Sequence, residues 1–306
     1  MPASFPRRRV LLVGLSTSRR DLPHTPPLGL MYLASYLRRS QAGVSVEIID
    51  QKISSVTDRQ IVSRGIDGQF GIVGLSFFTP GFSRARRIAE GIRRQAGDTA
   101  VVVGGPHVSS FMEDALAPEF DFGVFGEGEE VFERLVAHLC DGREPEDRSG
   151  LLYRRDGTVL AGAPRPPIKP LDSLPHPAWD LIDLRNYWKH DSFGLMGRRP
   201  YASIFTSRGC PYRCSYCHSI FGKRFRGRSP ENVLDEMEFL ATKKRVTEFE
   251  LVDDCFNFDR ARAMDILSLV RTRLPGARLL FPNGLRSDLI DADFVEALAA
   301  AGTYYI

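Results

Sequence analysis

Three cysteines stand close together in the segment RGCPYRCSYCHS, in a chain that has only five cysteines. Their spacing, C-x3-C-x2-C, puts Cys210, Cys214 and Cys217 on one short loop, where three thiolates can converge on a single centre but cannot pair evenly as disulfides. A structural zinc site needs a fourth protein ligand, which would have to be His218 or Cys255. A four-iron cluster held by three cysteines instead leaves one iron open to a ligand. The pattern therefore indicates a metal centre, and the open iron would be a place for chemistry.

Strands and helices must position this loop, and residues 203–306 supply them. The segment begins with a β-rich run, SIFTS, and the cysteine loop is followed by a helix start in which Ser229 is the N-cap and Pro230 the first helical residue. Further strands and helices then alternate: TEFELVDD, DRARAMDILSLVRTRL, RLLFPNGL, DADFVEALAAAG and a final TYYI. This order predicts an incomplete βα barrel with an open edge, which we expect to be a fragment or to be completed by something else.

Polar residues follow the second and third strands of this series. In βα barrels the working residues lie in the loops after the strands, at the carboxyl face. The candidates there, besides the cysteine loop, are Asp253 and Asp254 after one strand and Asn283 and Arg286 after the next. We expect these side chains to gather at one end of the sheet.

Residues 1–142 show five successive strand and helix patterns. Their strands are nearly continuous Val, Ile and Leu, as expected when helices cover both faces, so the prediction is a doubly wound parallel sheet of Rossmann-like, flavodoxin-like type. A ligand in such a sheet lies beyond the carboxyl ends of the strands, where small residues such as Gly104, Gly105, Gly126 and Gly128 let a large flat ligand approach the backbone. No G-x-G-x-x-G or G-x-x-x-x-G-K-[ST] motif is present, which argues against a phosphate-cradling nucleotide site. Glycines that only make tight turns are the alternative.

Residues 143–202 contain a hairpin signal and a connector. Asp156-Gly157 lies between two short β-rich runs, and a proline-rich stretch from Pro164 to Pro177 excludes a regular helix. We therefore place domains at 1–142 and 203–306, joined by 143–202.

Composition sets the broad class. The 306 residues are 43% hydrophobic with a net charge of +3, and no apolar run is long enough to span a membrane. This predicts a cytoplasmic protein and implies neither a membrane nor a nucleic-acid partner. The basic residues Lys223, Arg224, Arg226 and Arg228 are interpreted as the lining of a cofactor cleft or a domain interface rather than as an RNA-binding patch.

The three cysteines, with the aromatic Tyr216 before the last of them and a first barrel strand ahead, resemble the signature of the radical S-adenosylmethionine (SAM) superfamily. The resemblance implies that Cys210, Cys214 and Cys217 hold a [4Fe–4S] cluster whose open iron binds SAM, which is cleaved to a 5'-deoxyadenosyl radical. It also implies an external one-electron donor of flavodoxin or ferredoxin type. The implied SAM contacts are Tyr216 near the adenine, Asp253 and Asp254 at the amino group, and Asn283 and Arg286 at the ribose or carboxylate.

The domain before it then resembles the cobalamin-binding domain of B12-dependent radical SAM enzymes. The implied cobalamin contacts are Pro27, Leu28, Gly29, Ser76, Phe77, Phe78, Thr79, Gly104, Gly105, His107, Gly126, Glu127 and Gly128. The D-x-H-x-x-G motif that supplies a histidine to cobalt is absent, since Asp21 and His24 are one residue too far apart. We therefore expect cobalamin without a protein histidine ligand.

The resemblance implies an enzyme that methylates an unactivated carbon of a small-molecule or natural-product substrate, with methylcobalamin as the methyl donor. A cyclase or rearrangement enzyme of anaerobic porphyrin type is the first alternative. A non-catalytic, zinc-stabilised binding module is the second. We expect these 306 residues alone to be inactive.

Overall fold

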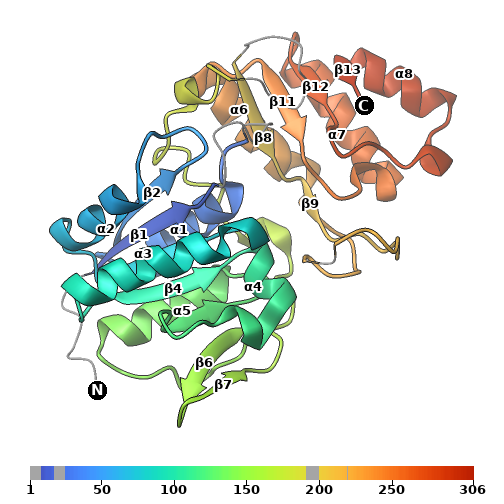
Figure 1. Ribbon diagram of the computed structural model, residues 1–306. Coiled ribbons are helices and arrows are strands. Elements are labelled where there is room, and N and C mark those ends of the chain that lie inside the picture. Colours follow the sequence, from blue (N-terminus) through green and yellow to red (C-terminus); the bar gives the residue numbers. More distant parts are fainter. Residues whose placement is uncertain (1–7, 17–24, 191–199, 219) are drawn as a thin grey trace. The chain divides into compact units, whose positions relative to one another are not determined.

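The computed structural model describes residues 8–16, 25–190, 200–218 and 220–306 (Figure 1). The chain divides into two compact units, and each is considered by itself. The first comprises the described residues within 1–21, 29–166 and 175–182, and the second those within 22–28, 167–174 and 183–306. Within the described ranges, no helix is both long enough and apolar enough to cross a membrane.

The first unit is built on a seven-stranded sheet in the order β2-β1-β3-β4-β5-β6-β7. Its first five strands are parallel, and the last two run antiparallel to their neighbours. The strands are β1 Arg9–Gly14, β2 Ser45–Asp50, β3 Ile72–Ser76, β4 Ala100–Gly104, β5 Phe122–Val124, β6 Leu151–Arg155 and β7 Thr158–Ala161. The helices are α1 Leu28–Ser40, α2 Asp58–Asp67, α3 Phe82–Gln95, α4 Pro106–Phe111 and α5 Glu129–Cys140, with 3-10 turns η1 Thr79–Gly81 and η2 Met112–Ala115.

Helices cover both faces of this sheet, as Figure 1 shows, and each face has its own core. Alternate residues of β1 point to opposite sides: Leu11 and Val13 join a cluster with α2 and α3, whereas Val10 and Leu12 join a cluster with α1 and α5. Each buried aliphatic side chain contributes about 1.5–3 kcal/mol. The predicted doubly wound parallel sheet is confirmed.

The hairpin at Asp156-Gly157 forms as predicted, and it also extends the sheet. Asp156 (φ 51°) and Gly157 (φ 78°) take the left-handed conformations that a tight two-residue hairpin turn requires. Gly123 of β5 pairs with Leu152 of β6, so the hairpin covers the edge that β5 would otherwise expose. The sheet is therefore larger than the five parallel strands expected from the βα pattern.

The second unit is a smaller parallel α/β layer. Its four-stranded sheet has the order β13-β12-β11-β8, and a separate antiparallel pair joins β9 to β10. The strands are β8 Tyr201–Ile204, β9 Ser207–Arg208, β10 Arg226–Gly227, β11 Glu248–Leu251, β12 Arg278–Leu280 and β13 Thr303–Tyr305. The helices are α6 Pro230–Lys244, α7 Arg260–Arg273 and α8 Ala292–Ala300, with 3-10 turns η3 Leu171–Ser173, η4 Leu184–Asn186, η5 Phe256–Phe258 and η6 Ser287–Leu289.

Side-chain caps fix where these helices begin. Ser229 accepts a hydrogen bond from the Asn232 N–H, with Pro230 in the first turn, as predicted. Asp259 and Asp291 cap α7 and α8 in the same way. The loops that precede these helices therefore end at defined residues.

Candidate functional site

The cysteine loop, residues 209–225, connects β9 to β10 within the second unit. These strands pair Arg208 with Arg226 and so close the neck of the loop. Gly209 opens it with φ 81°, and a Cβ atom there would lie 2.3 Å from the Arg224 carbonyl oxygen. Only glycine fits this close approach. The two ends of the loop are thus held together before the first cysteine.

All three motif cysteines are free thiols. Cys210 is half-buried, whereas Cys214 and Cys217 are exposed, and the Cys217 N–H donates to the Cys214 carbonyl in a turn of 3.1 Å. In the described part of the chain, no three His, Cys, Asp or Glu side chains are arranged as a metal site. The donor set of three accessible thiols on one loop nevertheless suits an iron–sulfur cluster in kind and number.

The Asp253 carboxylate binds the two residues that lie just before the cysteine loop in β9 and its approach, Thr206 and Ser207. Its Oδ1 accepts hydrogen bonds from the N–H groups of Thr206 (2.6 Å) and Ser207 (3.1 Å), and its Oδ2 accepts from both hydroxyls. The residue is 2% exposed. A buried carboxylate with four donors is a strong local anchor. Contact between Asp253 and SAM stays a prediction, while the structure describes its carboxylate as bound to the base of the loop.

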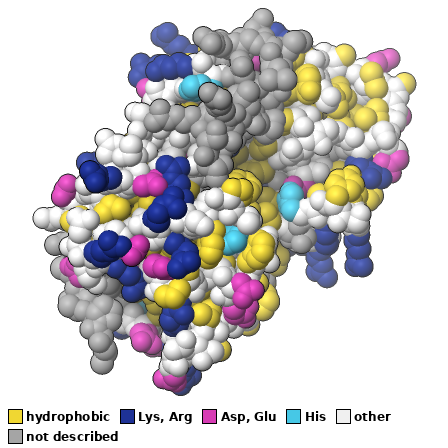
Figure 2. Space-filling model, in the orientation of Figure 1, with side chains coloured by type: hydrophobic (Ala, Val, Ile, Leu, Met, Phe, Trp, Pro, Cys, Tyr) yellow, Lys and Arg dark blue, Asp and Glu magenta, His cyan; other side chains and the backbone are white. Residues whose placement is uncertain are grey.

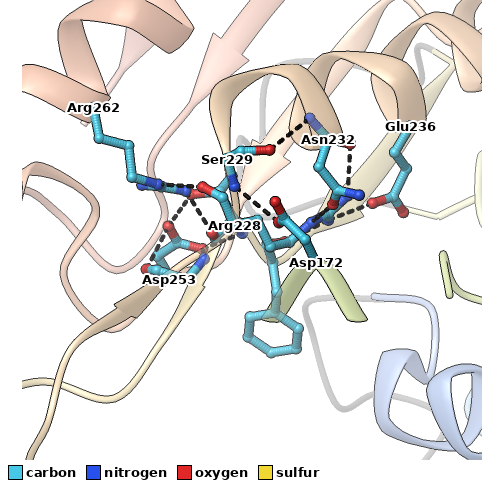
Figure 3. A network of polar contacts seen from close by, with 10 residues as sticks. Asp172, Arg228, Ser229, Asn232, Glu236, Asp253 and Arg262 are labelled. Carbon is cyan, nitrogen blue, oxygen red and sulfur yellow. Dashed lines mark hydrogen bonds and ion pairs between the residues drawn. The ribbon is translucent and has the colours of Figure 1, made fainter. Parts of the chain in front are cut away.

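A network of buried charged side chains surrounds Asp253 (Figure 3). Arg262 of α7 donates from Nε to the Arg228 carbonyl (2.6 Å) and from Nη2 to the Thr206 carbonyl, and it interacts electrostatically with Asp253. Arg228 in turn pairs with Glu236 of α6 at 2.5 Å, and both are almost fully buried. The network ties α6 and α7 to the cysteine loop.

Sequence reasoning missed this role. Arg226 and Arg228 are expected to line a cofactor cleft or a domain interface, and the structure describes both side chains as buried. Arg226 donates from Nη1 to the Ile168 carbonyl (2.7 Å) and from Nη2 to the Phe221 carbonyl (3.1 Å). The Ile168 carbonyl lies 58 residues from Arg226 in the sequence and the Phe205 carbonyl 23 residues from Arg228, so the local pattern gives no sign of these contacts.

Asp254, next to Asp253, has a different environment. Its Oδ1 lies 3.3 Å from His218 Nε2, and it accepts a hydrogen bond from the Gly209 N–H. Burial raises the pKa of the Asp254 carboxyl, and the neighbouring Asp253 adds to this, whereas His218 opposes it. The structure thus brings Asp254 beside the cysteine loop, at the end of β11 where it was predicted.

Cys255 is buried beside Cys210. Burial raises the pKa of the Cys255 thiol to about 12, and the interaction with Cys210 adds to the effect. From the sequence, Cys255 is only a possible fourth zinc ligand, because it lies outside the C-x3-C-x2-C motif. Only the alignment of two loops brings these two thiols together.

Tyr212, inside the motif, is clamped from two sides. The Arg286 guanidinium lies 3.8 Å from the centre of the Tyr212 ring, and the Phe258 ring meets it edge-on at 6.2 Å. Arg286 also forms a two-pronged ion pair with Asp288. The clamp joins the cysteine loop to the loops after β11 and β12.

Two asparagines connect those loops. The Asn257 side chain donates to the Arg286 carbonyl (2.9 Å) and accepts from the Arg286 N–H (3.0 Å). Asn283 donates to the carbonyls of Val252 (3.1 Å) and Asp253 (3.2 Å). Tyr216 is 91% exposed. Of the predicted SAM contacts, therefore, Asp254, Asn283 and Arg286 lie at one end of the sheet, and Tyr216 projects into solvent.

The carboxyl edge of the first sheet forms the second candidate region. The loops after β3 and β4 are joined by their backbones, since Phe77 N–H donates to the Gly104 carbonyl (3.4 Å) and His107 N–H to the Phe77 carbonyl (3.3 Å). Gly105 has φ 92°, and a Cβ atom there would lie 2.6 Å from Ser76 Oγ. Glycine is therefore required at 105 by the close approach of these two loops, and contact between this backbone and a ligand stays a prediction.

An aromatic stack fills this edge. His107 lies between Phe82 (ring centroids 4.8 Å apart) and Phe111 (4.5 Å), and its Nδ1 is 3.2 Å from Thr79 Oγ1. Burial lowers the pKa of His107, which keeps the ring neutral near pH 7. Phe78 is 63% exposed at the same edge.

The other predicted cobalamin contacts follow neighbouring strands. Gly126 N–H donates to Ser109 Oγ (3.0 Å), which links the loop after β5 to α4. Gly126, Glu127 and Gly128 precede α5, and Pro27, Leu28 and Gly29 lie at the start of α1. Asp21 and His24 lie outside the described residues.

Several basic side chains of α3 pair with acidic neighbours. On the face that Figure 2 shows, basic side chains are interspersed with acidic ones. Arg86 and Arg93 of α3, for example, pair with Glu119 and Asp121 at 2.7 and 2.6 Å. Such pairs contribute little to stability, but they leave less unpaired positive charge on α3.

Comparison with known proteins identifies one matching family and several relatives. Residues 22–136 match the B12 binding domain family. The chain is 34% identical over 285 residues, 92% of its length, to an uncharacterized methyltransferase of Pyrococcus horikoshii, and covers 60% of that protein. It is 31% identical over 242 residues, 78% of its length, to the anaerobic magnesium-protoporphyrin IX monomethyl ester cyclase of a Synechocystis strain, and covers 47% of it.

A solved structure has the same fold. The radical SAM methyltransferase TsrM of Kitasatospora setae, solved with cobalamin and a [4Fe–4S] cluster bound, superposes with a TM-score of 0.76 over 97% of this chain and 59% of that one, at 24% identity. This chain therefore spans about half to three-fifths of the length of these relatives. The predicted fold class and the resemblance to B12-dependent radical SAM enzymes are confirmed.

Proposed function

We propose that this chain is the cofactor-binding part of a B12-dependent radical SAM enzyme that methylates an unactivated carbon. One observation carries the proposal: a B12-binding domain match at residues 22–136 precedes a C-x3-C-x2-C loop on a parallel α/β sheet. When bound, the cluster, SAM and methylcobalamin supply one electron, a hydrogen-abstracting radical and a methyl group. The substrate is a small molecule, and the electron comes from a flavodoxin- or ferredoxin-type donor. The cytoplasm is the proposed location.

The cysteine loop is the proposed cluster site. Cys210, Cys214 and Cys217 hold the iron, and the β9–β10 neck with Asp253 keeps the ends of the loop in place. Two of the three thiols are exposed, so the loop can take up iron without unfolding the sheet beneath it.

The proposed SAM contacts differ in the hydrogen bonds and ion pairs that they already make within the protein. Asp254 lies beside the loop and offers its carboxyl group to the SAM amino group. Tyr216 is exposed and offers a ring face to the adenine. Asn283 and Arg286 already bind backbone and Asp288, so their proposed contribution is to shape the ribose end of the site.

The carboxyl edge of the first sheet is the proposed cobalamin site. Its glycines bring backbone near the ligand, and the exposed Phe78 offers an apolar face to the corrin. His107 is held in the aromatic stack with its Nδ1 on Thr79, which suits contact with the corrin periphery rather than with cobalt. Cobalamin is therefore proposed to bind without a histidine ligand from the protein. In this proposal residues 1–142 bind cobalamin, residues 143–202 connect, and residues 203–306 bind SAM.

A cyclase is the second candidate, because one of the relatives reported above is a magnesium-protoporphyrin ester cyclase at 31% identity. The two candidates differ in product. A methylated product supports the first, and a cyclised product of unchanged carbon count supports the second.

The deciding test is anaerobic reconstitution with iron, sulfide and cobalamin, followed by metal analysis and an absorption spectrum. We expect about four irons and one cobalamin per chain, with the iron lost in Cys214→Ala. Cys140→Ala, which removes a half-buried thiol from α5, is the matched control and should keep its iron. Zinc without iron, or no bound corrin, would overturn the proposal and favour a zinc-stabilised module.

A further inference from the structure

Two loops of the second unit run side by side in register. The alignment begins in the sheet, where Leu251 of β11 pairs with Ile204 of β8, and continues as the Val252 N–H donates to the Ile204 carbonyl (3.0 Å). One residue further, Asp253 holds Thr206 and Ser207. The loop after β11 therefore runs alongside the residues that precede the cysteine loop and holds them by hydrogen bonds.

This register ends with the Cys255 thiol within hydrogen-bonding reach of Cys210. Ring contacts place the same two segments together independently, because Phe258 of η5 packs against Tyr212 in the motif. Cys255 is 2% exposed and is followed by the buried Phe256 and Asn257. The buried Cys255 thiol thus approaches a motif cysteine from the protein side, away from solvent.

We propose that Cys255 is a positioning residue for the cluster, whose S–H group donates a hydrogen bond to the Cys210 sulfur and thereby makes the cluster easier to reduce. This inference rests on the proposed function. Reduction adds negative charge to the cluster and its thiolates, and a donor aimed at a ligand sulfur stabilises that charge. Because Cys255 is buried, water screens the interaction little.

Two other roles for Cys255 make different predictions. As a fourth iron ligand it would close the position that SAM needs, and its removal would lower the iron content. As a purely structural side chain it would affect folding but not the reduction potential. The potential at full iron content is therefore the readout that separates these roles.

The experiment compares Cys255→Ala, Cys255→Ser and Cys140→Ala with the parent chain after reconstitution. Each protein is titrated with reductant and followed by electron paramagnetic resonance, with iron content and circular dichroism measured on the same samples. We expect Cys255→Ala to lower the equilibrium constant for cluster reduction about tenfold, which is about 59 mV for one electron. Cys255→Ser keeps a donor and should remain close to the parent, and Cys140→Ala should match it.

Each outcome has a distinct meaning. Full iron with an unchanged potential in Cys255→Ala would overturn the inference while leaving the proposed function intact. Iron loss in Cys255→Ala and Cys255→Ser, with unchanged circular dichroism, would overturn it in favour of a ligand role. If Cys255→Ala does not fold, Cys255→Ser decides: a lowered potential there contradicts the inference. A parent chain without iron would overturn the proposed function and the inference with it.

Discussion

The two candidate regions are built from the same element, the loop after a parallel strand, but they are held by different forces. At the carboxyl edge of the first sheet, backbone hydrogen bonds and an aromatic stack around His107 join the loops. Beneath the cysteine loop, buried charges do so, centred on Asp253 and Arg262. The first arrangement suits a large flat ligand that needs a preformed apolar edge. The second leaves the thiols accessible and fixes only the base of their loop.

This difference predicts the largest effect for Asp253→Ala. The substitution removes the acceptor for four donors and leaves the Arg262 charge buried without its neighbour, which should destabilise the second unit by about 3–5 kcal/mol. Hydrogen exchange of β8 and β11 measures the loss in that unit alone. Asp288→Ala, on an exposed ion pair, is the control and should leave exchange unchanged. Equal exchange in both variants would contradict the charge-centred description.

Glycine matters most in the first unit. Gly105→Ala places a side chain at φ 92° and against Ser76, and should cost about 1–3 kcal/mol and weaken cobalamin binding. Gly97→Ala, where a Cβ atom meets nothing within 4 Å, is the matched control. Urea unfolding measures the loss of stability, and hydrogen exchange of the β3 and β4 amides shows whether the loss lies in the first unit. Similar stability for the two variants would show that the close approach of the loops is not required.

Acid should act on the first unit through His107. Burial lowers its pKa in the folded state, so the unfolded chain binds the proton more readily, and stability is lost as the pH falls below about 6.5. The slope for this one group is at most about 1.4 kcal/mol per pH unit. His107→Phe should flatten the dependence of unfolding on pH between 7 and 5. An unchanged slope would mean that His107 is not the group responsible.

The smallest effect is expected at the Tyr212 clamp. Arg286→Met removes the guanidinium from the ring, and iron should be released to a chelator roughly threefold faster, as suits an exposed cation–π contact. Tyr212→Phe keeps the ring and should release iron like the parent. If Arg286→Met also leaves release unchanged, the clamp does not hold the loop.

Local patterns in the sequence were sufficient for much of this protein. The cap at Ser229 and the turn at Asp156-Gly157 each depend on a few consecutive residues, and each forms where it was predicted. The spacing of Cys210, Cys214 and Cys217 is equally local, and the cluster site that it indicates stays a prediction. The alternation of strand and helix patterns likewise fixed the class of the sheets, because side-chain periodicity reports which faces are buried.

Tertiary structure alone decided how neighbouring polar residues differ. Asp253 and Asp254 are adjacent and identical in type, yet one is bound to the base of the cysteine loop and the other lies beside His218. The pairing of β11 with β8 also determined that Cys255 meets Cys210, and the pairing of β6 with β5 that the hairpin joins the first sheet. These outcomes depend on strand register between distant segments, which short-range sequence patterns do not encode.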